Sequence, residues 1–143
     1  MVINEFRMTV DSRSVNESFS RATVAAFTAQ LDPTVEEIND IKTAVSEAVT
    51  NCIVHGYRNT VGKIYISVKI HDDNKVIITV RDRGCGISDI KKAREPLFTT
   101  LGGDRAGLGF SVMESFTDKL TVRSKMGTGT TVTLCKKICG RAK

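Results

Sequence analysis

Apolar and polar positions along the chain repeat with two different periods, and these periods predict its secondary structure. Stretches rich in Val and Ile with period-two character predict strands at 3–10, 62–70, 75–81, 119–124 and 130–138. Apolar residues at helical spacing predict helices at 15–30, 35–55 and 109–117. Strand meanders with helices between them predict an α+β fold, a two-layer sandwich in which a mixed, mostly antiparallel sheet carries its helices on one face.

The predicted helices have distinct boundaries and apolar faces. In the first helix, one side carries Phe19, Ala22, Thr23, Ala26 and Phe27. The second helix follows the segment Asp32-Pro33-Thr34, and either Asp32 or Thr34 is in position to cap it. Its apolar arc, which we expect to face the sheet, is formed by Ile38, Ile41, Val45, Ala48, Val49 and Cys52.

Two polar residues of the second helix lie just beyond the edge of this apolar arc. Glu47 and Asn51 are four residues apart in SEAVTNCIVHGY, so they project about 40° apart around the helix. They are either ordinary boundary residues of an amphipathic helix or the polar wall of a cleft. The pattern of this one helix leaves both interpretations open.

Composition and charge narrow the class of protein. The 143 residues fit one domain, with 41% hydrophobic and 26% charged residues. No apolar run is long enough to span a membrane and MVINEFRMTV lacks a signal-peptide core, so we expect a cytoplasmic protein without membrane contact. The net charge is +5, yet basic residues gather only at 136–143, so we expect no direct nucleic-acid binding. The four cysteines form no CxxC pair, which favours free thiols over a metal site.

A second polar motif follows the strand predicted at 75–81. VIITVRDRGCGIS ends an apolar run with Asp82, which Gly84 and Gly86 follow in the pattern DxGxG. Such glycines permit positive φ angles and close approach of a ligand to the backbone. The carboxylate of Asp82 is in a position to accept a hydrogen bond from an exocyclic amine such as that of adenine. The alternative is a tight turn in which Asp82 caps its own loop.

A third motif precedes the helix predicted at 109–117. In GGDRAGLGFSVMESF, Gly107 and Gly109 come directly before the apolar positions of that helix. Free N–H groups at a helix N-terminus form an anion site, and glycines let phosphates approach it. The motif lacks the GK[ST] ending of a Walker loop. A single GxG pair is weak evidence, because it also occurs in simple turns.

Taken in order, ExxxN, DxGxG, GxG and the segment GTGTT resemble the ATP-binding domain shared by gyrase, Hsp90, histidine kinases and MutL, called the Bergerat or GHKL fold. The resemblance implies one such domain over residues 1–143. It implies that Asn51 binds Mg2+, that Glu47 is the general base, and that Asp82 binds adenine in a pocket shaped by Gly84 and Gly86. Further nucleotide contacts implied are Thr99, Gly107, Leu108, Gly109, Phe110 and Thr130, with Arg105 reaching the terminal phosphate and residues 91–106 forming a lid.

Other segments resemble one branch of that superfamily, the sporulation anti-sigma factors of the sigma F type. They are NESFSRATVAAFTAQLDPT, DIKTAVSEAVTN, IVHGY, VRDRGCGI and EPLFTT. The resemblance weakens in the lid segment LGGDRAGLG, which departs from the expected pattern at Gly102-Gly103, and in the basic tail. The resemblance implies an ATP-dependent protein serine kinase that forms a homodimer. It also implies that the kinase traps a sigma factor while ATP is bound and phosphorylates a serine of an anti-anti-sigma factor.

Alternatives remain open for the partner-binding surface and for the exact activity. By resemblance, Glu17 and Arg21 contact both protein partners, whereas their spacing alone is also that of an exposed i,i+4 ion pair. A stress-response relative with another sigma partner remains an alternative function. A nucleotide-dependent binding module without turnover is a second alternative.

Overall fold

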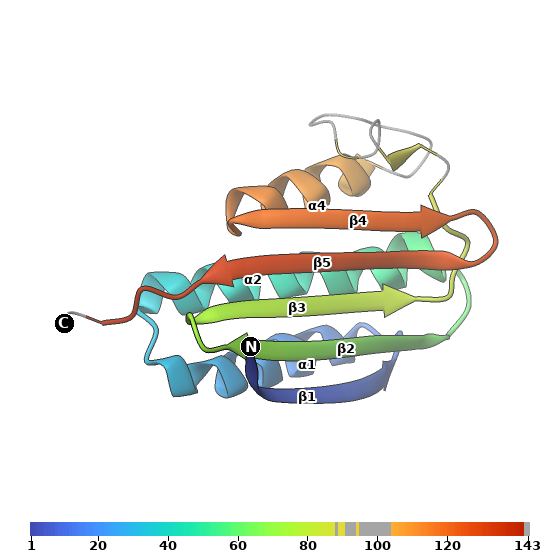
Figure 1. Ribbon diagram of the computed structural model, residues 1–143. Coiled ribbons are helices and arrows are strands. Elements are labelled where there is room, and N and C mark those ends of the chain that lie inside the picture. Colours follow the sequence, from blue (N-terminus) through green and yellow to red (C-terminus); the bar gives the residue numbers. More distant parts are fainter. Residues whose placement is uncertain (88, 91–93, 95–103, 142–143) are drawn as a thin grey trace.

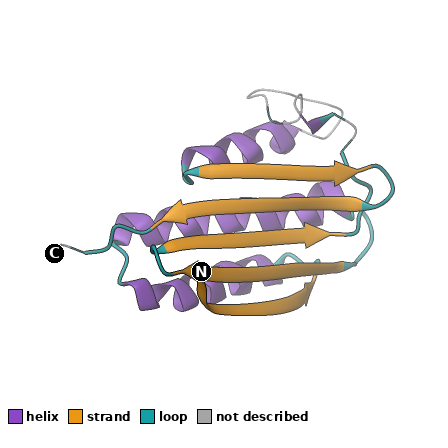
Figure 2. Ribbon diagram, in the orientation of Figure 1, coloured by secondary structure: helices purple, strands orange, loops and turns teal. Residues whose placement is uncertain are grey.

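The computed structural model describes residues 1–87, 89–90, 94 and 104–141, and Figure 1 traces the path of the chain. Its strands form one five-stranded sheet in the order β1-β2-β3-β5-β4. The strands are β1 (Val2–Asp11), β2 (Lys63–His71), β3 (Lys75–Asp82), β4 (Lys119–Lys125) and β5 (Gly129–Lys137). The helices lie together on one face of the sheet (Figure 2), which confirms the predicted two-layer α+β architecture.

All neighbouring strands in this sheet are antiparallel, so the expectation of a mixed sheet is wrong in this detail. Two helices connect β1 to β2, and one runs back along the sheet before the other returns. The chain therefore enters β2 in the direction opposite to β1. Strands β3 and β4 do run the same way, but β5 lies between them and pairs with both.

The helices begin and end close to the predicted positions, with two differences. They are α1 (Val15–Thr28) with a 3-10 turn η1 (Ala29–Leu31), α2 (Val35–Asn51) with a π-helical turn η2 (Cys52–Gly56), and α4 (Asp104–Ser115). The second predicted helix is thus regular only as far as Asn51. Helix α4 begins at Asp104, five residues before its predicted start at Gly109. None of the described helices is long and apolar enough to span a bilayer.

The core lies between the sheet and α2. Alternate residues of β2, β3 and β5 point toward the helices and are buried, which is the pattern of a sheet with one covered face. Helix α2 contributes Ile41, Ala44, Val45, Ala48, Val49 and Cys52 to this core. Ile38, expected in the arc, is only half-buried. Each fully buried Ile or Val contributes about 1.5–3 kcal/mol to folding, so α2 is fixed firmly on the sheet.

The predicted apolar face of α1 is only partly correct, because Phe27 packs against the core and against Phe6, whereas three of its five residues face solvent. Phe19, Ala22 and Ala26 are exposed, and the buried residues of α1 are Ser20, Val24 and Thr28. The hydroxyl of Ser20 donates to the Asn16 carbonyl at 2.6 Å, and that of Thr28 donates to the Val24 carbonyl at 2.8 Å. Because both hydroxyls are satisfied within the helix, their burial carries no unpaired polar group.

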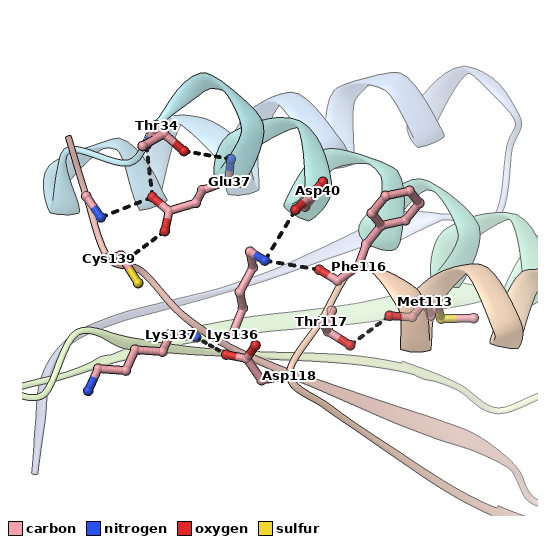
Figure 3. A network of polar contacts seen from close by, with 11 residues as sticks. Thr34, Glu37, Asp40, Met113, Phe116, Thr117, Asp118, Lys136, Lys137 and Cys139 are labelled. Atoms are coloured by element: carbon pink, nitrogen blue, oxygen red, sulfur yellow. Dashed lines mark hydrogen bonds and ion pairs between the residues drawn. The ribbon is translucent and has the colours of Figure 1, made fainter. Parts of the chain in front are cut away.

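Helix α2 begins with a capping box that also holds the segment after β5 (Figure 3). Thr34 is the N-cap: its side chain accepts from the Glu37 N–H at 3.0 Å, and Glu37 accepts from the Thr34 N–H at 2.9 Å. The same Glu37 carboxylate accepts N–H groups of Cys139 at 2.7 Å and Gly140 at 3.1 Å. Thr34, rather than Asp32, therefore caps this helix.

Basic residues near the end of β5 are paired with acidic ones. Lys136 lies 3.4 Å from the Asp40 carboxylate on α2 and donates to the Phe116 carbonyl after α4 at 3.4 Å (Figure 3). Arg141 lies 2.9 Å from Asp32. These side chains join β5 to α2 and to the end of α4, so this part of the basic segment contributes to the fold.

Candidate nucleotide site

Glu47 and Asn51 lie on the last turns of α2, both half-buried. The Asn51 amide faces α4, where a Cβ built on Gly109 would lie 3.1 Å from Asn51 Oδ1. Within the described residues, Asn51 Nδ2 is buried and has no hydrogen-bond partner. A buried amide in this state is unusual, and it marks the gap between α2 and α4 as a place where a polar ligand would be favoured.

Asp82 ends β3 and is buried, with 5% of its surface exposed. Its Oδ1 accepts the N–H of Gly84 at 2.9 Å, and the Cys52 thiol on η2 also bonds to this carboxylate. Burial raises the pKa of Asp82, although these two donors and a backbone hydrogen bond from Thr130 act in the opposite direction. Burial, together with the nearby Asp82 charge, raises the pKa of the Cys52 thiol strongly. The site therefore contains a buried carboxylate whose pKa is raised even though three groups donate hydrogen bonds to it.

Glycines allow the backbone segments around Asp82 to touch. A Cβ at Gly84 would lie 2.1 Å from the Gly56 oxygen, and a Cβ at Gly129 would lie 2.1 Å from the Asp82 oxygen. At Gly86, where φ is +80°, a Cβ would lie 2.3 Å from the Lys125 oxygen. No side chain fits at these positions without moving the backbone. The DxGxG loop is therefore packed between η2 on one side and the β4–β5 turn on the other.

Thr130, predicted by resemblance, pairs with Asp82 across the β3–β5 ladder and is buried. Its hydroxyl lies 2.7 Å from Ser124 Oγ on β4, and Ser124 also accepts the Ile87 N–H at 2.7 Å. Ser124 thus ties the loop after Asp82 to β4 and β5. Ser124 is not predictable from the sequence, because a single serine at the end of a strand carries no distinctive pattern.

The predicted phosphate-binding residues lie on α4 only in part as expected. Gly107, Leu108, Gly109 and Phe110 are inside the helix, not ahead of it, and Phe110 is buried in the core. Arg105 belongs to the first turn of α4, and the structure describes its backbone only. Thr99, Gly102-Gly103 and most of 91–106 lie outside the described residues. The glycines of the motif therefore belong to the helix itself, and Gly109 lies beside Asn51.

Glu17 and Arg21 form the i,i+4 pair that their spacing predicts, and the pair continues onto α2. Ser46 donates to Glu17 Oε2 at 2.5 Å and lies 3.5 Å from Arg21 Nη1. Next to this cluster is a pocket of about 340 Å³, open to solvent. It is lined by Arg21, Asn39, Lys42, Thr43, Ser46 and Glu47. The structure therefore brings the expected partner-binding residue and the expected base to one surface pocket.

These residues fit a nucleotide with its metal. A buried carboxylate beside close-packed glycines is suited to an adenine amine, and Gly109 of α4 lies beside the Asn51 amide. Because Asn51 Nδ2 makes no hydrogen bond within the described residues, the amide can rotate without losing one. Its oxygen can then face a hard cation. Asp82, Thr130, Asn51 and Gly109 come from four elements, β3, β5, α2 and α4, that the fold brings to one edge.

The fold is that of a nucleotide-binding ATPase domain, as the comparison with protein families shows. The model of the histidine kinase-like ATPase domain matches residues 9–136. A solved structure described as the RsbU and RsbW domains of a Mycobacterium tuberculosis protein superposes with a TM-score of 0.71 at 24% identity, covering 95% of this chain and 32% of that one. The histidine kinase domain of an Erythrobacter litoralis blue-light activated kinase gives 0.54 at 19% identity, covering 85% and 60%. These two likenesses concern the fold.

Curated relatives are much more similar in sequence. An anti-sigma F factor of Thermoanaerobacter sp. strain X514 is 61% identical over 128 residues, which cover 89% of both chains. The anti-sigma F factor of Geobacillus stearothermophilus is 53% identical, covering 95% of this chain and 94% of that one, and that of Bacillus subtilis strain 168 is 51% identical, covering 94% and 93%. The chain belongs to the family of anti-sigma F factors, protein serine kinases built on the histidine kinase-like ATPase domain.

Proposed function

We propose that this kinase holds ATP with Mg2+ at the edge formed by α2, β3 and α4 and phosphorylates a serine of an anti-anti-sigma protein. While ATP is bound, it captures a sigma factor of the sigma F type, as the names of its relatives indicate for them. Capture and phosphorylation use one protein surface. Each partner therefore excludes the other, and the nucleotide decides which one is held.

The observation that carries this proposal is the pocket shared by Arg21 and Glu47. It is about 340 Å³ in volume and opens on the surface between α1 and α2. That volume holds a few side chains of a docked protein segment. A serine hydroxyl entering there would meet Glu47, while Asn51 lies one turn further along the same helix.

The side chains on α2 have separate roles in the transfer. Glu47 accepts or orients the proton of the serine hydroxyl, a contribution of about 10²–10⁴-fold in rate for a well-placed base. Asn51 presents its amide oxygen to the cation, which supplies charge neutralisation at the phosphates. Asp82 accepts from the adenine amine, and burial keeps water from competing for that hydrogen bond. Arg105, in the first turn of α4, is the expected contact to the terminal phosphate.

Further parts of the proposal rest on the family. We place the protein in the cytoplasm, where sigma factors act. We also expect it to be a homodimer. One alternative is a stress-response sigma partner, and the 51–61% identity to several anti-sigma F factors argues against it. The other alternative is a binding module without turnover, and the presence of both Glu47 and Asn51 argues against that.

The decisive experiment uses the full chain with ATP labelled on the γ-phosphate. Incubation with the purified anti-anti-sigma factor is expected to transfer label to one serine, and its Ser→Ala variant serves as the control. In parallel, the sigma factor is expected to be retained with ATP and lost once the anti-anti-sigma factor is added. Retention of the sigma factor without any transfer of label would instead identify a binding module.

A further inference from the structure

The segment His55-Gly56-Tyr57 follows helix α2, which carries Glu47 and Asn51, and contacts the loop after Asp82. The hydroxyl of Tyr57 makes two hydrogen bonds at this contact. Tyr57 follows η2, where its N–H donates to the Cys52 carbonyl at 2.9 Å, five residues back. Its hydroxyl donates to the Lys63 carbonyl at the start of β2. The same oxygen accepts the N–H of Arg83 at 2.7 Å, directly after Asp82.

These two hydrogen bonds continue the β2–β3 ladder beyond its last pair. The ladder ends where Ile64 faces Asp82, so Lys63 and Arg83 would form the next pair. Instead of bonding to each other, their carbonyl and N–H meet the Tyr57 hydroxyl between them. The two strands therefore separate at the position where the DxGxG loop begins, and a side chain from η2 sets the width of the opening.

The ring of Tyr57 packs against the backbone of Gly62. A Cβ on Gly62 would lie 2.3 Å from Tyr57 Cε1, so the ring lies directly over the Gly62 backbone. Gly62 is itself held by Ser12, whose hydroxyl accepts the Gly62 N–H at 2.9 Å and whose N–H donates to the Gly62 carbonyl at 2.9 Å. The hydroxyl is thus presented from a fixed support.

Gly56, the residue before Tyr57, lies against the Asp82 carboxylate. The Gly56 carbonyl accepts the Cys85 N–H at 2.9 Å, and a Cβ on Gly56 would lie 2.8 Å from Asp82 Oδ2. A shift of Tyr57 therefore moves both Gly56, against which the Asp82 carboxylate packs, and Arg83, the residue after Asp82. Neither contact involves Glu47 or Asn51.

We propose that Tyr57 is a positioning residue for adenine recognition, which holds the Asp82 carboxylate where it meets the exocyclic amine of the base. This inference rests on the proposed function, in which Asp82 binds adenine. It assigns to Tyr57 a share of the selectivity for adenine over guanine. Guanine carries a carbonyl where adenine carries its amine, so a well-placed carboxylate repels it, and a displaced one discriminates less.

The test measures binding of ATP and GTP to the full chain and to Tyr57→Phe, which keeps the ring and removes the hydroxyl. Loss of the bridge is expected to raise the Kd for ATP about 3- to 10-fold and to leave the Kd for GTP within about twofold. The ATP-to-GTP ratio therefore falls by about the same factor. Tyr65→Phe is the matched control, because it removes the hydroxyl of the other tyrosine in the chain. The ring of Tyr65 faces Arg81 and Arg83 at 5.0 Å, a contact that phenylalanine keeps.

Combination with Asp82→Asn shows whether Tyr57 acts through Asp82. In that background Tyr57→Phe is expected to change the ATP Kd less than twofold, since coupled residues are not additive. An unchanged ATP-to-GTP ratio in Tyr57→Phe, with a reduced ratio in Asp82→Asn, would overturn the role of Tyr57 alone. Unchanged ATP binding in Asp82→Asn would overturn the adenine contact and this inference with it. Gly62→Ala displaces the ring from its other side, so it must lower the same ratio and provides the test should Tyr57→Phe fold poorly.

Discussion

Asn51 on α2 lies directly against Gly109 on α4, in the region predicted to bind phosphates. A Cβ on Gly109 would lie 3.1 Å from Asn51 Oδ1 and 3.2 Å from Nδ2, so the absence of a side chain on α4 makes room for the amide on α2. Gly109 thus lies inside α4, where glycine is otherwise unfavourable. Its contact with Asn51 accounts for glycine at this position.

Gly109→Ala is expected to separate stability from ligand binding. Alanine in a helix interior gains about 1 kcal/mol over glycine, and crowding of the Asn51 amide offsets part of this gain. The free energy of unfolding should therefore change by less than about 1 kcal/mol, while the Kd for Mg-ATP rises about tenfold. Titration calorimetry with Mg2+ and with EDTA checks the cause. A defect of equal size in EDTA would contradict a role of Asn51 at the metal.

Asp82→Asn is expected to weaken binding of ATP and ADP by about 1.5–3 kcal/mol, the size of a hydrogen bond to a charged group. The apo protein should respond in the opposite way. Burial raises the pKa of Asp82, so the folded state binds more protons than the unfolded state between the two pKa values. Stability is therefore lost as the pH rises through this interval, and asparagine avoids the loss. Urea unfolding at pH 7 should show a more stable variant, and equal or lower stability would contradict the direction of the shift.

Glu47→Gln is expected to bind ATP normally and to phosphorylate the anti-anti-sigma serine on the order of 10²-fold more slowly, because glutamine retains the shape but accepts no proton. ATP-dependent sigma capture should persist, since capture requires bound nucleotide and not its transfer. Asn51→Ala should lose Mg-ATP affinity as well as rate. Single-turnover transfer by Glu47→Gln at nearly the wild-type rate would show that Glu47 is not the base.

Arg21→Glu is expected to impair capture of both protein partners while ATP affinity stays the same. The change places a second carboxylate beside Glu17, which already accepts from Ser46, and reverses the charge at the edge of the pocket. Pull-down of each partner with ATP present measures the effect. Lys119→Glu, at the exposed start of β4, is a charge-reversal control. Equal capture by both variants would remove Arg21 from the partner surface.

Glu37→Gln is expected to reduce stability by about 0.5–2 kcal/mol at pH 7, the range for a helix cap. Burial opposes the charge of Glu37, but N–H groups of Thr34, Cys139 and Gly140 outweigh it and lower the pKa of this carboxyl. Because the folded pKa is below the unfolded one, this stabilisation is fully present above the ordinary pKa of a glutamate carboxyl and is lost as the pH falls through the folded pKa. The two proteins should therefore converge in urea unfolding as the buffer is acidified below that range. The exposed neighbour variant Glu36→Gln should match wild type throughout.

The order of strands and helices was predictable from the sequence because long apolar periods dominate local structure. The buried face of α1 was not predictable, because Ser20 and Thr28 are polar residues. Their hydroxyls donate to carbonyl groups of the same helix, which allows both residues to be buried. The start of α2 was only half resolved between Asp32 and Thr34. The Thr34-x-x-Glu37 capping box was visible in the sequence and favours Thr34.

The candidate site was predictable as a set of motifs and not as a geometry. The pattern DxGxG indicates that the backbone approaches something, but Gly84 meets Gly56 and Gly86 meets Lys125, contacts between segments far apart in the chain. The π-helical turn at 52–56, which brings Tyr57 to Arg83, has no sequence signature comparable to a helix cap. The GxG motif predicts a helix that begins at Gly109, whereas in the structure Gly109 lies inside α4 and contacts Asn51.

The hydrogen bonds to the Glu37 carboxylate also affect the order in which parts of the fold form during synthesis. Its two distant donors, the N–H groups of Cys139 and Gly140, follow it by 102 and 103 residues. At roughly 5–20 residues per second, a ribosome adds them on the order of 5–20 s after Glu37. Until then α2 has its local cap alone, and the edge strand β4 has no partner because β5 is made after it. The full cap of α2 and the pairing of β4 are therefore completed only after the last strand has been made.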